Sequence, residues 1–201
     1  MKFDQEKSDA ADEVGEQYNQ WLLDNCTGEP NAYTLAAMDY ASKGWAVIPL
    51  KQQGKTPLTK NGSKDATKDI SLIQDWWECD YEWANIGIAT GKESGIFVLD
   101  VDEKSDGYKS LEALEKNGKL PETLTAETGG GGLHIFFKHP GIKIRNSAGE
   151  LDTGLDIRGD GGYVVAAPSI HPNGKEYKWV DYETPIAEAP NWLIRMITSP
   201  D

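Results

Sequence analysis

The stretch Gly95-Ile96-Phe97-Val98-Leu99-Asp100-Val101-Asp102 has the pattern of a buried strand that ends in two carboxylates. Its apolar residues are mostly β-branched or aromatic, which is typical of a central strand. Side chains alternate between the two faces of a strand, so Asp100 and Asp102 are expected to point to the same side. Two carboxylates in one small volume repel each other unless a cation or a shared proton separates them, and Mg²⁺ or Mn²⁺ suits such hard oxygen ligands. The pair therefore predicts a divalent-metal site.

The alternative interpretation of this pair is a strand end whose acids face water and cap the next helix. That helix is expected over residues 107–117. Ser105 or Asp106 is better placed to cap it, which leaves Asp100 and Asp102 available for a cation.

Length and composition predict one substantial domain. The chain has 201 residues, of which 38% are hydrophobic, enough for one large core. Acidic residues outnumber lysines in residues 1–30. We therefore expect an acidic leader with a helix over residues 1–30, followed by the main domain over residues 31–201.

The charge balance limits how the chain can bind nucleic acid. Its formal net charge is −13, with a pI near 4.6. Affinity for nucleic acid depends largely on Lys and Arg that neutralise phosphates, so any such partner must be held locally.

Targeting and cysteine patterns predict a cytoplasmic protein. No stretch approaches the ~20 apolar residues of a membrane helix, and the N-terminus is acidic where a signal peptide is basic and then apolar. Cys26 and Cys79 belong to no CxxC or Cys/His cluster, so neither a structural zinc nor a disulfide framework is expected. We expect both to be ordinary thiols.

Hydrophobic periodicity and turn residues predict alternating helices and strands along the chain. The helices are expected near residues 9–23, 31–44, 69–79 and 192–198, and the strands near residues 45–50, 85–91, 123–127, 133–137, 154–159, 163–167 and 177–179.

Two loops have the composition of anion-binding loops. Lys51 and Lys55 flank a glycine turn that could approach an anion, although a surface loop often has no such role. Residues 129–132 are four successive glycines, whose N–H groups could form an anion-binding nest. A flexible hairpin tip is the alternative for the second loop, but it does not explain the histidine that follows at once, His134.

Polar residues recur on three apolar strands: the Asp100 and Asp102 pair, His134, and Asp156 with Arg158. A lone buried polar group is costly, so their recurrence predicts one shared polar cleft. Three acids suffice for two divalent ions, and the histidine, arginine, lysines and glycine turn supply donors. By chemistry this is a triphosphate site. No GxxxxGK[ST] motif is present, which excludes the usual P-loop.

Together these motifs resemble a known family. The pattern comprises Val-Leu-Asp100-Val-Asp102, Thr128-Gly-Gly-Gly-Gly-Leu-His134, and Leu-Asp156-Ile-Arg158-Gly-Asp-Gly-Gly-Tyr-Val-Val-Ala-Ala-Pro168-Ser169-Ile-His171. It resembles the bifunctional primase-polymerase (Prim-Pol) domain of replication proteins from plasmids, phages and other mobile elements, in the archaeo-eukaryotic primase superfamily. The resemblance covers about residues 31–180, and the combination of motifs is more specific than any one of them.

The resemblance implies an α/β (α+β) fold, with an RRM-like mixed β-sheet flanked by helices. It also implies a DNA primase and polymerase that joins dNTPs or NTPs on a single-stranded DNA template and primer. In the family pattern Asp100, Asp102 and Asp156 hold Mg²⁺ or Mn²⁺ and are catalytic, and His134 contacts the nucleotide phosphates. The further nucleotide-side contacts implied are Arg158, Lys55, Thr128, Gly130, Ser169 and His171.

Family members commonly act with a replicative helicase, fused or in trans, and some carry a zinc insert or a helical bundle that helps to start primers. The cysteines and the length do not provide these elements here, so template-directed extension is a firmer expectation than de novo priming.

Two other functions fit the same residues. Three acids and a histidine also suit a metal-dependent nuclease. A non-catalytic replication-initiation or DNA-binding module could keep the fold without the chemistry. At single positions, His171 could be a structural hydrogen-bond partner, and Lys143 and Arg145 could contact template or only water. His139 is expected in a surface loop.

Overall fold

The computed structural model describes residues 30–198. The acidic leader with its expected helix lies outside the described residues, as do residues 199–201. Four α-helices are described, namely α2 (Ala32–Ser42), α3 (Ile70–Gln74), α4 (Gly107–Leu114) and α5 (Asn191–Thr198). The short helices of other types are η1 (Gly62–Asp65), the π-helix η2 (Asp75–Asp80), η3 (Glu103–Ser105) and η4 (Glu115–Asn117).

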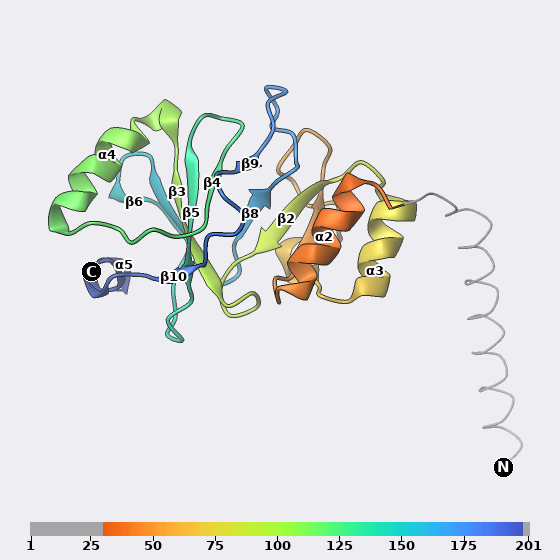
Figure 1. Ribbon diagram of the computed structural model, residues 1–201, viewed down its shortest axis with the longest axis horizontal. Helices are drawn as coiled ribbons and strands as arrows, with labels where there is room; N and C mark the ends of the chain where they lie inside the picture. The colour runs from red at the N-terminus through yellow and green to blue at the C-terminus, as the bar shows by residue number, and fades with distance from the viewer. Residues whose placement is uncertain (1–29, 199–201) are drawn as a thin grey trace, which may run out of the picture.

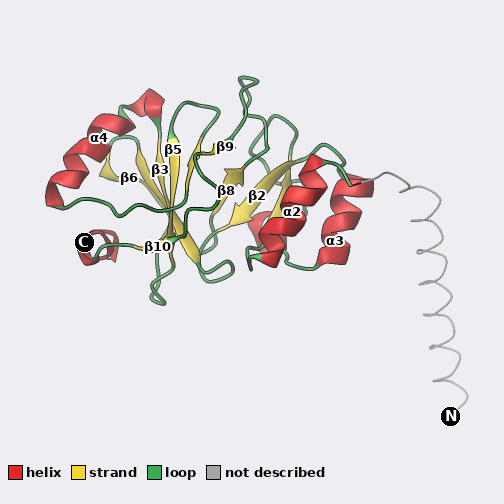
Figure 2. Ribbon diagram, viewed as in Figure 1, coloured by secondary structure: helices red, strands yellow, loops and turns green. Residues whose placement is uncertain are grey.

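The strands form two sheets, which lie between the helices at the two ends of the molecule (Figure 2). The small sheet has the order β1-β2-β8 and is antiparallel, with bounds β1 (Val47–Leu50), β2 (Asn85–Ala89) and β8 (Tyr163–Ala166). The large sheet has the order β6-β7-β3-β5-β4-β9, with β10 parallel to β5. Its strands are β3 (Ile96–Val101), β4 (Thr125–Glu127), β5 (Leu133–Lys138), β6 (Ser147–Asp152), β7 (Leu155–Arg158), β9 (Lys178–Trp179) and β10 (Ala187–Glu188). This mixed α/β architecture, with antiparallel sheets flanked by helices, confirms the expected fold class.

The quoted stretch forms β3, which lies at the centre of the large sheet between β5 and β7. Alternation along these strands gives the sheet two different faces. One face, which we call the helix face, is apolar and packs against α4 and α5 through Leu114 and Leu193. Its strand residues are Phe97, Leu99, Val101, Ile135, Phe137, Leu155 and Ile157. Figure 1 shows both helices on the side of the large sheet that faces away from β2.

The opposite face, which we call the cleft face, is divided into an apolar part and a polar part. Val98 and Phe136 belong to a core cluster with Ile86 and Val164 of the small sheet. This shared core holds the two sheets together. The cleft face also carries Asp100, His134, Asp156 and Arg158.

Local signals account for most of the helix boundaries. The Asn31 side chain caps α2 by accepting hydrogen bonds from the N–H groups of Tyr33 and Thr34. Asp69 caps α3 in the same way. The helix expected over residues 69–79 continues from α3 into η2, where Trp77 is fully buried, as core packing predicts.

Some expectations differ from the structure. β6 and β10 were not expected, because β6 is a mostly exposed polar edge strand and β10 has only two residues. The helix expected over residues 107–117 is α-helical only to Leu114. Cys79 is disulfide-bonded, so the expectation of an ordinary thiol is wrong for it, and Cys26 lies outside the described residues.

Within residues 30–198, no helix combines the length and the hydropathy that a membrane crossing requires.

Candidate active site

A row of three polar residues crosses the cleft face of the large sheet. Asp100 of β3 is the register partner of Asp156 in β7 and of His134 in β5. Residues that are direct partners in a ladder project to the same side, with Cβ atoms about 5 Å apart. Pairing of the strands therefore brings together three residues that are far apart in the sequence.

Arg158 links the two carboxylates of this row. Its Nη2 donates to Asp100 Oδ2 at 3.0 Å and to Asp156 Oδ2 at 2.8 Å, and its Nε donates to Asp100 Oδ2 at 3.3 Å. Arg158 pairs with Val98 in the ladder, which places it on the cleft face beside both acids. The two carboxylates thus share one cation, as expected for acids that are close enough to repel each other.

His134 lies on the other side of Asp100. Its Nε2 is 3.5 Å from Asp100 Oδ1, and its side chain is 7% exposed. Burial lowers the pKa of His134, and the positive charges of Lys55 and Arg158 lower it further, while Asp100 opposes the shift. The imidazole is therefore neutral at neutral pH. Its buried Nδ1 has no hydrogen-bond partner among the described residues.

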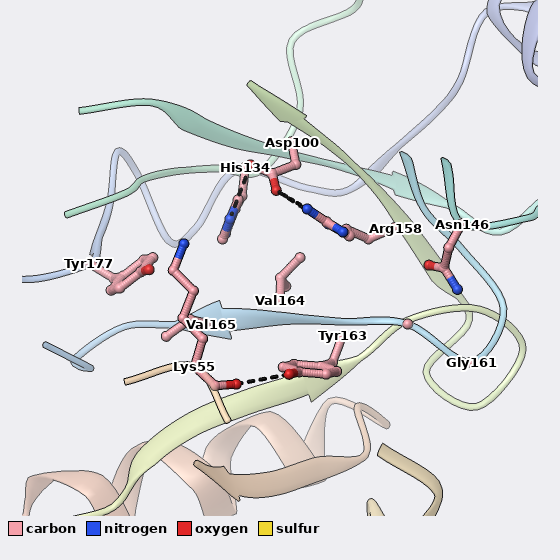
Figure 3. A pocket seen from close by; sticks show the side chains of 11 residues that line it. Lys55, Asp100, His134, Asn146, Arg158, Gly161, Tyr163, Val164, Val165 and Tyr177 are labelled. Atoms are coloured by element: carbon pink, nitrogen blue, oxygen red, sulfur yellow. Dashed lines mark hydrogen bonds and ion pairs between the residues drawn. The ribbon is translucent and has the colours of Figure 1, made fainter. Parts of the chain in front are cut away.

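These residues form one wall of a cavity of about 260 Å³. Figure 3 shows Asp100, His134 and Arg158 above the cavity, and Lys55, Tyr163 and Val165 below it. The lower wall belongs to β8 and to the loop after β1. The Tyr163 hydroxyl donates to the Lys55 carbonyl at 2.8 Å, which ties that loop to β8. The cavity thus lies between the two sheets, and we call it the cleft.

Asp102 does not join the row. β3 ends at Val101, and Asp102 caps η3 instead. Its Oδ1 accepts the Lys104 N–H at 3.0 Å, and its Oδ2 accepts the Ser105 hydroxyl at 3.0 Å. Asp106 precedes α4 but makes no side-chain capping bond. Asp106 thus occupies the expected N-cap position of α4, but the expectation that Asp102 would remain available is wrong, because it caps η3.

Over residues 30–198, no three His, Cys, Asp or Glu side chains are grouped in a way that could hold a metal ion. The structure brings two of the three expected ligands together, Asp100 and Asp156. Both carboxylates bind the Arg158 guanidinium, and Asp100 lines the cleft while Asp156 lies beside it in the ladder. Paired carboxylate oxygens are the ligand type that a hard divalent cation prefers.

The glycine turn and His171 lie beside a second hollow. Thr128 closes the turn by accepting the Gly132 N–H on its hydroxyl at 3.0 Å. Thr128, Gly129 and Gly131 line this hollow together with Lys175 and Lys178. A Cβ on Gly130 would lie 3.7 Å from His171 Nε2, so His171 packs close to the turn.

Tyr177 lines the cleft, and its ring lies near both His134 and His171. Its ring centroid is 5.9 Å from that of His134 and 6.0 Å from that of His171. Burial, and then the Asp100 carboxylate, raises the pKa of the Tyr177 phenol, so it keeps its proton and can donate a hydrogen bond.

Ser169 does not line either hollow. Its side chain is fully buried, and its hydroxyl accepts the Ile86 N–H at 2.8 Å and lies 3.4 Å from the Ile86 carbonyl. In this structure Ser169 anchors β2 and has no surface for a nucleotide.

Sequence reasoning did not identify several residues that line the cleft, namely Asn146, Gly161, Tyr163, Val165 and Tyr177. The Asp-Gly-Gly turn at residues 160–162 and the aromatic residue after it could have indicated Tyr163. Asn146 precedes an edge strand without periodicity, so the sequence contains no signal for it.

The comparisons with known proteins give one family match. The family model described as bifunctional DNA primase/polymerase, N-terminal, matches residues 37–192. The matched range contains every residue of the cleft. No curated protein matches the chain at a significant level.

Proposed function

The chain belongs to the bifunctional DNA primase/polymerase family, and on that premise we propose that it joins nucleoside triphosphates on a single-stranded DNA template. The observation that carries the proposal is the row of Asp156, Asp100 and His134, with Arg158 between the acids. It combines oxygen ligands for cations with donors for phosphates in one cleft.

Mg²⁺ or Mn²⁺ fits the acids of this row. Asp100 and Asp156 would hold the ion, and Asp102 would join them as a third carboxylate if it released a bond within η3. Such ions, when bound, neutralise phosphate charge and lower the pKa of an attacking hydroxyl. The β3 and β7 ladder would position Asp100 and Asp156 for this.

The donors of the cleft would bind the triphosphate of the incoming nucleotide. Lys55 and Arg158 supply positive charge, and His134, which is neutral, supplies a ring N–H. A neutral donor can bind a phosphate oxygen without adding repulsion toward a cation held by Asp100. We assign Thr128, Gly130 and His171 to the nucleotide side through the second hollow, and Ser169 to the support of β2.

The remaining parts of the proposal concern partners. The substrates would be dNTPs or NTPs, a DNA template and a primer, and the activity would serve replication of a plasmid, phage or other mobile element. A replicative helicase would act with it, fused or in trans.

A templated incorporation assay tests the proposal. A single-stranded template would be offered with and without a primer, with dNTPs or NTPs, and with Mg²⁺ or Mn²⁺. We expect metal-dependent extension that Asp156→Asn lowers by about 100-fold or more, since it removes a charge required at the reacting phosphate. Asp80→Asn, at an exposed acid of η2, is the matched control and should leave extension unchanged. Full extension by Asp156→Asn would refute the proposal.

The same samples separate the two alternatives. A nuclease would cleave DNA with metal and without nucleotides. A non-catalytic module would bind DNA but show no metal-dependent affinity for nucleotides. If no extension is seen, DNA cleavage would support the nuclease, and DNA binding without metal-dependent nucleotide affinity would support the non-catalytic module.

A further inference from the structure

A hollow lined by three lysines lies beside the cleft. Its volume is about 520 Å³, and Lys64, Lys92 and Lys143 line it. Lys64 belongs to η1 and the other two lysines to two separate loops, and all three are exposed. Gly161 lines both this hollow and the cleft, so the two are adjacent. We call it the lysine hollow.

One turn holds these three segments in place. Asp160 accepts the Lys92 N–H on Oδ1 at 3.1 Å and the Ile144 N–H on Oδ2 at 3.0 Å. The next residue, Gly161, accepts the Ser63 hydroxyl on its carbonyl at 3.0 Å. The backbone beside each lysine is therefore anchored to the same two residues. The grouping of the lysines follows from these bonds.

Two glycines mark where these segments approach each other closely. Gly91 has φ +91°, and a Cβ there would lie 2.5 Å from Asp160 Cα, so no other residue would fit without moving the backbone. A Cβ on Gly162 would lie 2.2 Å from Asn146 Oδ1 and would displace that side chain. The lysine hollow is thus built by close packing of its segments.

The charge of the lysine hollow opposes that of the whole chain, which is −13. No carboxylate of residues 30–198 forms an ion pair with any of the three lysines. Asp160, which also lines the hollow, accepts two backbone N–H bonds on its carboxylate oxygens and lies 3.2 Å from His139 Nε2. Glu93 also lines the hollow, and Lys68 donates to its carbonyl at 2.9 Å. Positive charge therefore exceeds negative charge here.

The position of the lysine hollow relative to the cleft indicates its ligand. Figure 3 shows Lys55, His134 and Tyr177 toward one end of the cleft, and Asn146 and Gly161 toward the other. A nucleotide whose triphosphate is held by Lys55 and His134 at one end of the cleft would extend its base toward Gly161 at the other end. The template base that pairs with it would then lie at that end, with the template phosphates beyond it, next to the lysine hollow. From this geometry, and resting on the proposed function, we infer that the lysine hollow binds the sugar-phosphate backbone of the single-stranded template.

Replacement of the three lysines tests the inference. The variant K64Q/K92Q/K143Q would be titrated with a fluorescently labelled single-stranded oligonucleotide, by anisotropy, over a series of salt concentrations. Each lost phosphate contact lowers the slope of log affinity against log salt by about 0.7 for single strands, so we expect a loss of about 2 in the slope. Affinity at low salt should fall about tenfold or more.

A matched control removes the same charge elsewhere. K109Q/K116Q/K119Q changes three exposed lysines on and just after α4, which covers the helix face. It should keep the wild-type slope and most of the affinity. An unchanged slope in K64Q/K92Q/K143Q, an equal loss in the control, or a loss confined to duplex DNA would overturn the inference.

A second readout separates this inference from the proposed function. Binding of a dNTP with Mg²⁺, measured by calorimetry without DNA, should be the same in K64Q/K92Q/K143Q and in the wild type. A wild type that binds DNA but no metal-nucleotide complex would refute the proposed function. A wild type that extends primers while K64Q/K92Q/K143Q keeps its DNA affinity would refute only the assignment of the lysine hollow.

Discussion

The two faces of the large sheet are built from the same strands in the same register, yet they differ in almost every property. The helix face is wholly apolar and is covered by α4 and α5. The cleft face is apolar only where it meets the small sheet, and beyond that part it carries two carboxylates, a guanidinium and an imidazole. A strand can do both because neighbouring residues point in opposite directions. The helix face therefore serves packing alone, whereas the cleft face combines packing with the residues to which we assign the chemistry.

The largest effect should come from the helix face. Phe137 of β5 is fully buried and stacks on Phe97, with ring centroids 5.4 Å apart. Phe137→Ala should lower the free energy of unfolding by about 3–5 kcal/mol, because it leaves a cavity. Urea denaturation followed by circular dichroism measures this loss. A loss below about 1 kcal/mol would contradict the packing role assigned to this face.

Replacing Ser169 should have an intermediate effect on stability and no direct effect on nucleotide binding. Ser169→Ala leaves the buried Ile86 N–H without its acceptor, which costs about 1–3 kcal/mol of unfolding free energy. Nucleotide affinity at a temperature where the variant stays folded should match the wild type. A selective loss of nucleotide affinity, with unchanged stability, would instead make Ser169 a ligand contact.

Arg158 should affect two ligands in opposite directions. Arg158→Gln removes the cation that Asp100 and Asp156 share, so the two carboxylates should bind Mn²⁺ more tightly in the absence of nucleotide. We expect a gain of about tenfold in affinity, which corresponds to about 1.4 kcal/mol. Affinity for the nucleotide should fall because a phosphate donor is lost. Calorimetric titrations with Mn²⁺ alone and with a dNTP measure both changes. Parallel changes in the two affinities would contradict this account.

Asp102 should have the smallest effect on stability. Asp102→Asn keeps a good capping residue for η3, so the free energy of unfolding should change by less than about 0.5 kcal/mol. Primer extension should nevertheless fall by about tenfold or more, because a third carboxylate ligand is lost. Undiminished extension would limit the role of Asp102 to capping.

The sequence predicted the main strands of the cleft face but not the residue at which each strand ends. The alternation of Leu99, Asp100 and Val101 correctly predicted the face to which each side chain points, because alternation is a local property of one strand. The same alternation did not hold for Asp102, since the strand ends one residue earlier and the Asp102 carboxylate caps η3. Where a strand ends depends on backbone bonds that periodicity does not reveal.

Properties that depend on contacts between distant segments were less accessible. The recurrence of polar residues on apolar strands predicted that Asp156, Asp100 and His134 share a cleft, but the register that aligns them is set by strand pairing. His139 was expected in a surface loop, but its side chain is 4% exposed and pairs with Asp160. Likewise the lysine hollow forms because the turn at Asp160 gathers segments from three regions, which no single stretch of sequence encodes.

The central claim is that the row on the cleft face binds a nucleoside triphosphate together with a divalent ion. Calorimetric titration of a dNTP in the presence of Mn²⁺ tests it most directly, with the wild type, Asp100→Asn and the control Asp80→Asn side by side. The account predicts binding by the wild type and by Asp80→Asn, and a loss of about 100-fold or more for Asp100→Asn, with all three proteins equally folded by circular dichroism. Equal affinity in all three proteins would contradict it.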